Sequence, residues 1–140
     1  MDEEQDCLGD WKIEKIIDAA GNYDSQSINS EIQDLIGSAP IVVYSFVDCP
    51  WCIAAQSLLQ SEYSDVEVTY VELETLNRRG KAIRSELAKL TRRTSMPCIF
   101  VNGKAIGGYT DGAPFDVGLQ ALHESGRFAK LIHSSTNQRN

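Results

Sequence analysis

Positive charge is scarce in this sequence. Thirteen Lys and Arg face 20 Asp and Glu over 140 residues, so the formal net charge is -7. An acidic chain repels polyanions, which argues against a nucleic acid or an anionic membrane surface as a partner. Long hydrophobic runs are missing too, because none approaches the roughly 20 residues that a membrane-spanning helix needs. We therefore expect no nucleic-acid partner and no membrane partner.

The N-terminus lacks the features of a targeting segment. "MDEEQDCLGDW" has neither the basic start nor the apolar stretch of a secretory signal, and its acidity is opposite to the Arg-rich character of a mitochondrial transit peptide. These features predict a cytoplasmic protein. In the reducing cytosol, the four cysteines of the chain are more consistent with catalysis or metal binding than with a disulfide framework.

Cysteine and histidine pairs at the spacing of metal ligands are also scarce. A structural zinc site needs four ligands. The chain contains a single Cys-x-x-Cys motif, Cys49 and Cys52, and its two histidines, His123 and His133, stand apart from each other. A second pair at ligand spacing is missing, so we predict no bound metal from the residues alone.

What the chain does contain is a regular alternation of helical and strand patterns. The pattern predicts that residues 1–26 form an extension with one amphipathic helix and that residues 27–133 form the main domain. Residues 134–140 are predicted to be a frayed tail. Further helices are expected from Ser27 to a cap at Gly37, from Pro50 to about Tyr63, over 81–90, and from Val117 to Glu124, where Gly126 ends the last helix. Strands are expected at 41–46, 66–73, 98–101 and 105–106.

The order of these elements predicts an α/β fold. The strands at 41–46 and 66–73 are joined through a helix and should be parallel, while the Asn102-Gly103 turn should join the last two strands as an antiparallel hairpin. The outcome is a mixed four-stranded sheet sandwiched by helices.

The Cys-x-x-Cys motif lies where a buried strand meets a helix. A thiol in the first turn of a helix meets unpaired backbone N–H groups and the positive end of the macrodipole, which favour the thiolate. The pKa of such a thiol can fall from about 8.5 into the range of about 3.5–7.5. Cys49 is therefore the predicted nucleophile, and Cys52, one turn further in, the predicted resolving thiol. A permanent disulfide is disfavoured by the reducing compartment and by the strain of so short a loop.

Three motifs together identify a family. "CPWC" (49–52), "TSMP" (94–97) and "NGKAIGGYTDG" (102–112) resemble, in this order and spacing, the dithiol glutaredoxins, a branch of the thioredoxin fold. The resemblance covers roughly residues 28–132. It implies a thioredoxin-like fold, a cis peptide bond before Pro97, and glutathione as co-substrate.

The resemblance also implies a binding site for glutathione. Met96 would pair its backbone with the cysteinyl unit, Thr110 and Asp111 would hold the γ-glutamyl end, and Arg84 would clamp the glycine carboxylate. The implied active-site support comes from Pro50, Trp51 and Pro97, and the implied glutathione-binding set consists of Arg84, Met96, Pro97, Gly108, Thr110 and Asp111.

Two departures from the family pattern concern the site. Many glutaredoxins have a Lys three residues before the first cysteine, where this chain has Phe46. That change removes one cation and leaves more of the thiolate stabilisation to the helix end. Residues 112–118, "GAPFDVG", form an insertion before the last helix, and the sequence does not indicate its role.

Two further cysteines and a basic cluster have alternative interpretations. Cys98 is either a small buried residue at a strand start, the favoured reading, or an extra redox thiol. Cys7 is either an exposed thiol of little consequence or a site of intermolecular disulfide formation. Six basic residues either form a solvated helix face or, as we favour, assist an anionic ligand: Arg78, Arg79, Lys81, Arg84, Arg92 and Arg93.

Two functions are compatible with the resemblance. The first is a monomeric glutathione-dependent thiol–disulfide oxidoreductase that reduces protein disulfides and glutathionylated proteins through Cys49. The second is a dimer that carries a [2Fe–2S] cluster ligated by the Cys49 thiolates of two subunits and two glutathiones. The Cys-Pro-aromatic-Cys type is chiefly catalytic by resemblance, so the oxidoreductase is the favoured function.

Overall fold

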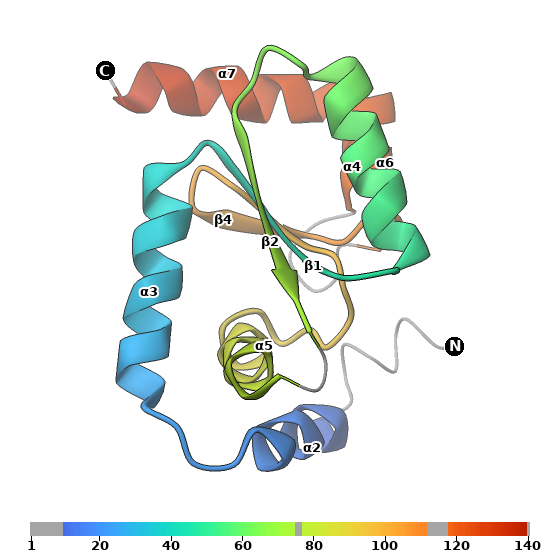
Figure 1. The fold of residues 1–140 in the computed structure, drawn as a ribbon. Helices are drawn as coiled ribbons and strands as arrows, with labels where there is room; N and C mark the ends of the chain where they lie inside the picture. The colour runs from blue at the N-terminus through green and yellow to red at the C-terminus, as the bar shows by residue number, and fades with distance from the viewer. Residues whose placement is uncertain (1–9, 75–76, 112–117, 140) are drawn as a thin grey trace.

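A four-stranded sheet forms the centre of the molecule (Figure 1). The computed structural model describes residues 10–74, 77–111 and 118–139, with side chains described up to residue 133. The strands lie in the order β2–β1–β3–β4; β1 pairs with β2 in parallel, and the other two pairings are antiparallel. The predicted mixed α/β sheet is therefore confirmed. The strands are β1 (Ile41–Phe46), β2 (Val68–Leu73), β3 (Cys98–Val101) and β4 (Lys104–Gly107).

Strand β1 is central and contributes side chains to both faces of the sheet. Residues 41–45 are all buried, as a continuous apolar run predicts for a strand covered on both sides. Because side chains alternate along a strand, Val42 and Tyr44 enter one hydrophobic cluster, whereas Ile41 and Val43 enter the other. One strand therefore joins the two cores.

Helices cover both faces of the sheet (Figure 1). One core is enclosed by α3 (Ser25–Ser38) and α5 (Arg78–Thr91), and α2 (Asp10–Ala20) packs on α5. The other core is enclosed by α4 (Pro50–Glu62), α6 (Leu119–Glu124) and α7 (Arg127–Arg139). None of these helices is long and apolar enough to span a bilayer.

Several element boundaries differ from those predicted. Helix α3 begins at Ser25, because Asp24 accepts a hydrogen bond from the backbone N–H of Ser27 and caps the helix. Gly37 lies inside this helix instead of capping it. Asn77 likewise caps α5 through the N–H groups of Arg79 and Gly80, so α5 begins at Arg78 and not at 81.

Helix α7 continues to Arg139 and so includes most of the segment that was predicted to be a frayed tail. The helix is anchored by Phe128, which is fully buried and packs edge-on against Tyr63 at a centroid distance of 4.9 Å. The i, i+3, i+4 spacing of Phe128, Leu131 and Ile132 is typical of a helix, and Gly126, at φ 82°, separates α7 from α6. Two features named from the sequence, Cys7 and the inserted segment at 112–117, lie outside the described residues.

Candidate active site

Cys49 lies between the end of β1 and the start of α4. The chain turns through Asp48, which adopts a left-handed conformation at φ 66°, and Cys49 then caps the helix. Its Sγ accepts the backbone N–H of Cys52 at 3.3 Å, and Pro50 occupies the first helical turn, where a missing N–H removes no helical hydrogen bond. Cys49 is partly exposed. A helix N-terminus with a partly exposed sulfur as its cap stabilises negative charge on that sulfur.

Cys52 occupies a different environment one turn into α4. Its side chain is 5% exposed and belongs to the core between the sheet and α5. Burial raises the pKa of the Cys52 thiol to about 12, and a hydrogen bond to Cys49 acts in the same direction. The two thiols of the motif are therefore unequal: Cys49 is accessible, whereas Cys52 keeps its proton.

The second motif lies directly beside the first. The Met96–Pro97 peptide bond is cis, as the resemblance implied. The Sγ of Cys49 lies 3.9 Å from the carbonyl oxygen of Met96, although 47 residues separate the two in the sequence. The start of β3 thus forms a wall next to Sγ of Cys49.

A hollow of about 150 Å³ lies next to this wall. The third motif supplies its far side, where the N–H of Gly108 donates to the carbonyl of Asp111 at 2.6 Å. A Cβ at Gly108 would lie 2.9 Å from Nη2 of Arg93 and 3.2 Å from the carbonyl oxygens of Asp111 and Pro97, so glycine allows these segments to approach closely. The hollow is lined by Trp51, Arg93, Ser95, Met96, Pro97, Gly108, Tyr109, Thr110 and Asp111.

Arg93, one of the six basic residues named from the sequence, lines the hollow. Its side chain is 5% exposed, and Nη1 lies 3.2 Å from Oδ2 of Asp111. This buried ion pair fastens the Asp111 loop to the segment before Pro97. A basic residue directly before "TSMP" was the available signal, but the sequence alone does not distinguish it from its exposed neighbour Arg92.

Aromatic side chains close another side of the hollow. Trp51 is 55% exposed, and its ring stacks on Tyr109 with an interplanar angle of 27° and a centroid distance of 6.2 Å. Tyr109 was not among the predicted site residues, although it precedes Thr110 in the same motif. The two rings connect the Cys49 helix with the loop of the third motif.

Arg84 lies outside this hollow, in an adjoining part of the surface. Its guanidinium group donates to the carbonyl of Thr94 at 2.9 Å and lies over the Phe46 ring at 5.0 Å from its centroid. It lines an adjacent open groove of about 390 Å³ that shares Ser95 with the hollow. Arg84, the residue predicted to bind the glycine carboxylate, therefore lies in the neighbouring groove and not in the hollow lined by the other predicted ligand residues.

The six basic residues do not form one cluster. Arg79 pairs with Glu31 on α3, Arg93 is buried against Asp111, and Arg92 caps the end of α5 in a left-handed conformation. Cys98 is 2% exposed, pairs across the sheet with Tyr44, and does not line the hollow. Within the described ranges, three or more potential metal-binding side chains do not come together anywhere.

Comparison with known proteins gives consistent matches. The family model described as Glutaredoxin matches residues 41–106. The dithiolic glutaredoxin 2-C-Grx1 of Trypanosoma brucei brucei is 30% identical, with a TM-score of 0.61 over 72% of this chain and 94% of that chain.

Two curated relatives match over similar ranges. The mitochondrial Glutaredoxin-2 of Bos taurus is 34% identical over 81% of this chain, and the chloroplastic Glutaredoxin-C4 of Oryza sativa subsp. japonica is 29% identical over 71%. The chain spans 65% and 68%, respectively, of the lengths of these two relatives.

The prediction of a cytoplasmic protein is wrong. Several matching relatives are named as mitochondrial proteins in cattle, orangutan and human and as a chloroplastic protein in rice, which argues against the cytoplasmic assignment. The acidity of the first residues was a poor guide, because the composition of a short terminal segment does not determine the compartment in which the folded domain works.

Proposed function

The chain belongs to the glutaredoxin family, and from this premise we propose that it is a glutathione-dependent thiol–disulfide oxidoreductase. The observation that carries the proposal is the position of Cys49, a partly exposed helix cap 3.9 Å from the carbonyl of Met96 and beside a hollow. Its proposed substrates are protein disulfides and glutathionylated proteins, and the proposed active form is a monomer.

In the first step, the Cys49 thiolate attacks one sulfur of the substrate disulfide. A bond forms between that sulfur and Sγ of Cys49, the substrate S–S bond breaks, and the other sulfur leaves as a thiolate that takes a proton from water. The substrate thiol is reduced and Cys49 is oxidised to a mixed disulfide. The N-terminus of α4 supports the charge on Sγ before the attack.

The second step regenerates the Cys49 thiolate. When the substrate is a glutathionylated protein, Cys49 carries the glutathionyl group; a second glutathione thiolate attacks the glutathionyl sulfur, oxidised glutathione leaves, and Cys49 is released as a thiolate. When the substrate is a protein disulfide, Cys52 attacks Sγ of Cys49, the bound protein sulfur leaves as a thiolate, and two glutathiones then reduce the Cys49–Cys52 disulfide and leave as oxidised glutathione. The raised pKa of Cys52 makes its thiolate rare at neutral pH, which favours attack by glutathione.

Glutathione would bind along the hollow. We assign its cysteinyl unit to the backbone of Met96 beside Pro97, and its γ-glutamyl end to Thr110 and Asp111 near Gly108. Trp51 would cover the ligand as an aromatic wall. Arg84 would reach the glycine carboxylate from the adjacent groove.

Substitution of each cysteine tests the assignment. In glutathione-coupled reduction of a small mixed disulfide, Cys49→Ser should abolish activity, because serine at this position is not ionised at neutral pH. Cys52→Ser should retain most activity, because glutathione itself can resolve the mixed disulfide. Cys98→Ser serves as the matched control for loss of a buried thiol. Activity that survives in Cys49→Ser would contradict the assignment of the nucleophile.

The comparisons do not favour the alternative of a [2Fe–2S] carrier. Among the described cysteines, Cys49 is the one thiol with enough exposure to ligate a cluster shared between two subunits. Anaerobic purification distinguishes the two functions, because a cluster-bearing dimer is coloured and absorbs visible light. A colourless protein with reductase activity supports the enzyme.

A further inference from the structure

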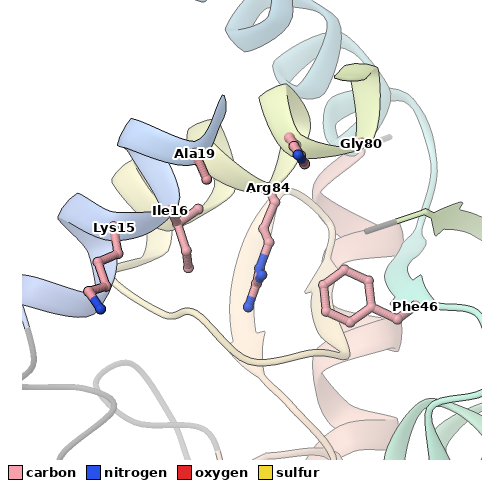
Figure 2. Close-up of a pocket in the computed structure, with 7 residues that line it drawn as sticks. Lys15, Ile16, Ala19, Phe46, Gly80 and Arg84 are labelled. Atoms are coloured by element: carbon pink, nitrogen blue, oxygen red, sulfur yellow. The ribbon is translucent and has the colours of Figure 1, made fainter. Parts of the chain in front are cut away.

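Helix α2 forms one wall of a cationic groove next to the proposed active site. The helix precedes the region matched by the glutaredoxin model, and Ile13 and Ala20 are buried where it packs on α5. Figure 2 shows Arg84 of α5 extending between Ile16 of α2 and the ring of Phe46. The pocket around Arg84, of about 150 Å³, is lined by Lys15, Ile16, Ala19, Phe46, Gly80, Lys81 and Arg84.

This pocket is continuous with the hollow beside Cys49. Lys15, Ile16 and Arg84 line both the pocket and the open groove of about 390 Å³, and Ser95 lines both that groove and the hollow. A ligand that lies in the hollow can therefore extend past Ser95 to reach Arg84 and Lys15.

Among the described residues, the cations of the pocket have no acidic partner. No carboxylate in the described parts of the chain lies within ion-pair distance of Lys15, Lys81 or Arg84. Nε of Arg84 also has no hydrogen-bond partner. The described acids of α2 include Glu14 and Asp18, which are exposed and line neither the pocket nor the groove. Three cations at one place on a chain of net charge -7 are a complementary site for an anion.

We propose that Lys15 of α2 is a specificity-determining residue. Together with Arg84 and Lys81, it forms a binding site for a carboxylate of the glutathionyl ligand. The proposal rests on the proposed function. Phe46 holds the Arg84 guanidinium through its ring, and α2 supplies a cation from the other side of that guanidinium. The N-terminal helix is then part of the binding site as well as part of the fold.

A cycle of protein and ligand changes tests this role. The substrate is the mixed disulfide of glutathione and 2-mercaptoethanol, used as the free acid, as its glycine ester, and as its γ-glutamyl α-ester. Lys15→Ala should lower kcat/KM for the free acid about three- to fivefold, the range of a partly exposed ion pair. The loss should appear as a higher KM with kcat unchanged. Lys15→Glu should lower kcat/KM further, whereas Lys15→Arg should restore kcat/KM to the wild-type value.

The esters identify which carboxylate binds. The ester that removes the bound carboxylate should be turned over equally by wild type and Lys15→Ala, while the other ester should keep the difference. Lys104→Ala, an exposed lysine in β4, is the matched control and should behave as wild type. An equal loss on all three substrates, or no loss on any, would overturn the role of Lys15. A wild-type protein inactive on every substrate would instead overturn the proposed function.

Discussion

The three cysteines in the described part of the chain differ in solvent exposure. Cys49 is partly exposed at the start of α4, whereas Cys52 and Cys98 are 5% and 2% exposed. Burial raises the pKa of Cys98 to about 11, against smaller opposite effects of Arg93 and Thr91. Its environment supports the interpretation of a small buried side chain in a strand over that of a third redox thiol.

Alkylation of the native protein measures this difference. In a Cys7→Ser background at pH 8, iodoacetamide should modify Cys49 rapidly and leave Cys98 unmodified, because about one Cys98 thiol in a thousand is ionised at that pH. Peptide-resolved mass spectrometry gives the rate at each site. Denaturant should make Cys98 reactive and serves as the control. Native labelling of Cys98 at the rate of Cys49 would instead favour the redox interpretation.

A buried carboxylate joins helices that are distant in the sequence. Oε2 of Glu86 on α5 accepts hydrogen bonds from Tyr23 at 2.6 Å, Ser25 at 2.5 Å and Lys89 at 2.8 Å. Burial acts to raise the pKa of Glu86, but the bonds from Lys89, Ser25 and Tyr23 together hold it below the ordinary value of 4.5. The link between α2 and α3 is therefore attached to α5.

Removal of this charge should destabilise the protein in a pH-dependent way. Glu86→Gln should lower the free energy of unfolding by about 2 kcal/mol at pH 7, since bonds to a buried charge are lost. Because the pKa of Glu86 is lowered on folding, its contribution is complete above pH 4.5 and disappears as the pH falls through the folded value.

Urea unfolding at pH 7 and pH 3 gives the measurement. The difference between wild type and Glu86→Gln should shrink at the lower pH. Glu14→Gln, an exposed change on α2, should have little effect at either pH. A difference that grows on acidification would mean that Glu86 is not stabilised as a carboxylate.

At the scale of the whole molecule, two cores share one strand. The cluster under α3 and α5 and the cluster under α4, α6 and α7 lie on opposite faces of the sheet, and β1 contributes to both (Figure 1). A change in one core is therefore expected to reach the other through the pairing of β1 with β2 and β3.

Truncation of Phe128 tests this coupling. Phe128→Ala should lower the free energy of unfolding by about 3–5 kcal/mol, because it removes a fully buried ring that packs against Tyr63. Trp11 lies in α2 on the other side of the sheet, so in a Trp51→Phe background, which leaves Trp11 as the single tryptophan, the fluorescence should change at the same denaturant concentration as the far-UV circular dichroism. Lys130→Ala on the same helix is the control. Two separate transitions would contradict a single cooperative unit.

Local patterns in the sequence determined much of the fold and the position of Cys49 at the start of a helix. The buried run at 41–46, the Pro50 position after Cys49 and the Asn102-Gly103 turn depend on backbone and side-chain preferences within a few residues. The structure follows all three. The three motifs together also pointed to the family, because their order and spacing are specific even where each motif alone is weak.

Only the tertiary structure decided which distant residues meet. Arg93 pairs with Asp111, 18 positions away, and Lys15 lines the same pocket as Arg84, 69 positions away. The fold also places Arg84 outside the hollow. Their placement depends on how α2, α5 and the Asp111 loop pack around the sheet, and no local preference encodes that packing. A basic residue in the sequence specifies a charge, whereas the fold determines whether that charge is buried in an ion pair or left to bind a ligand.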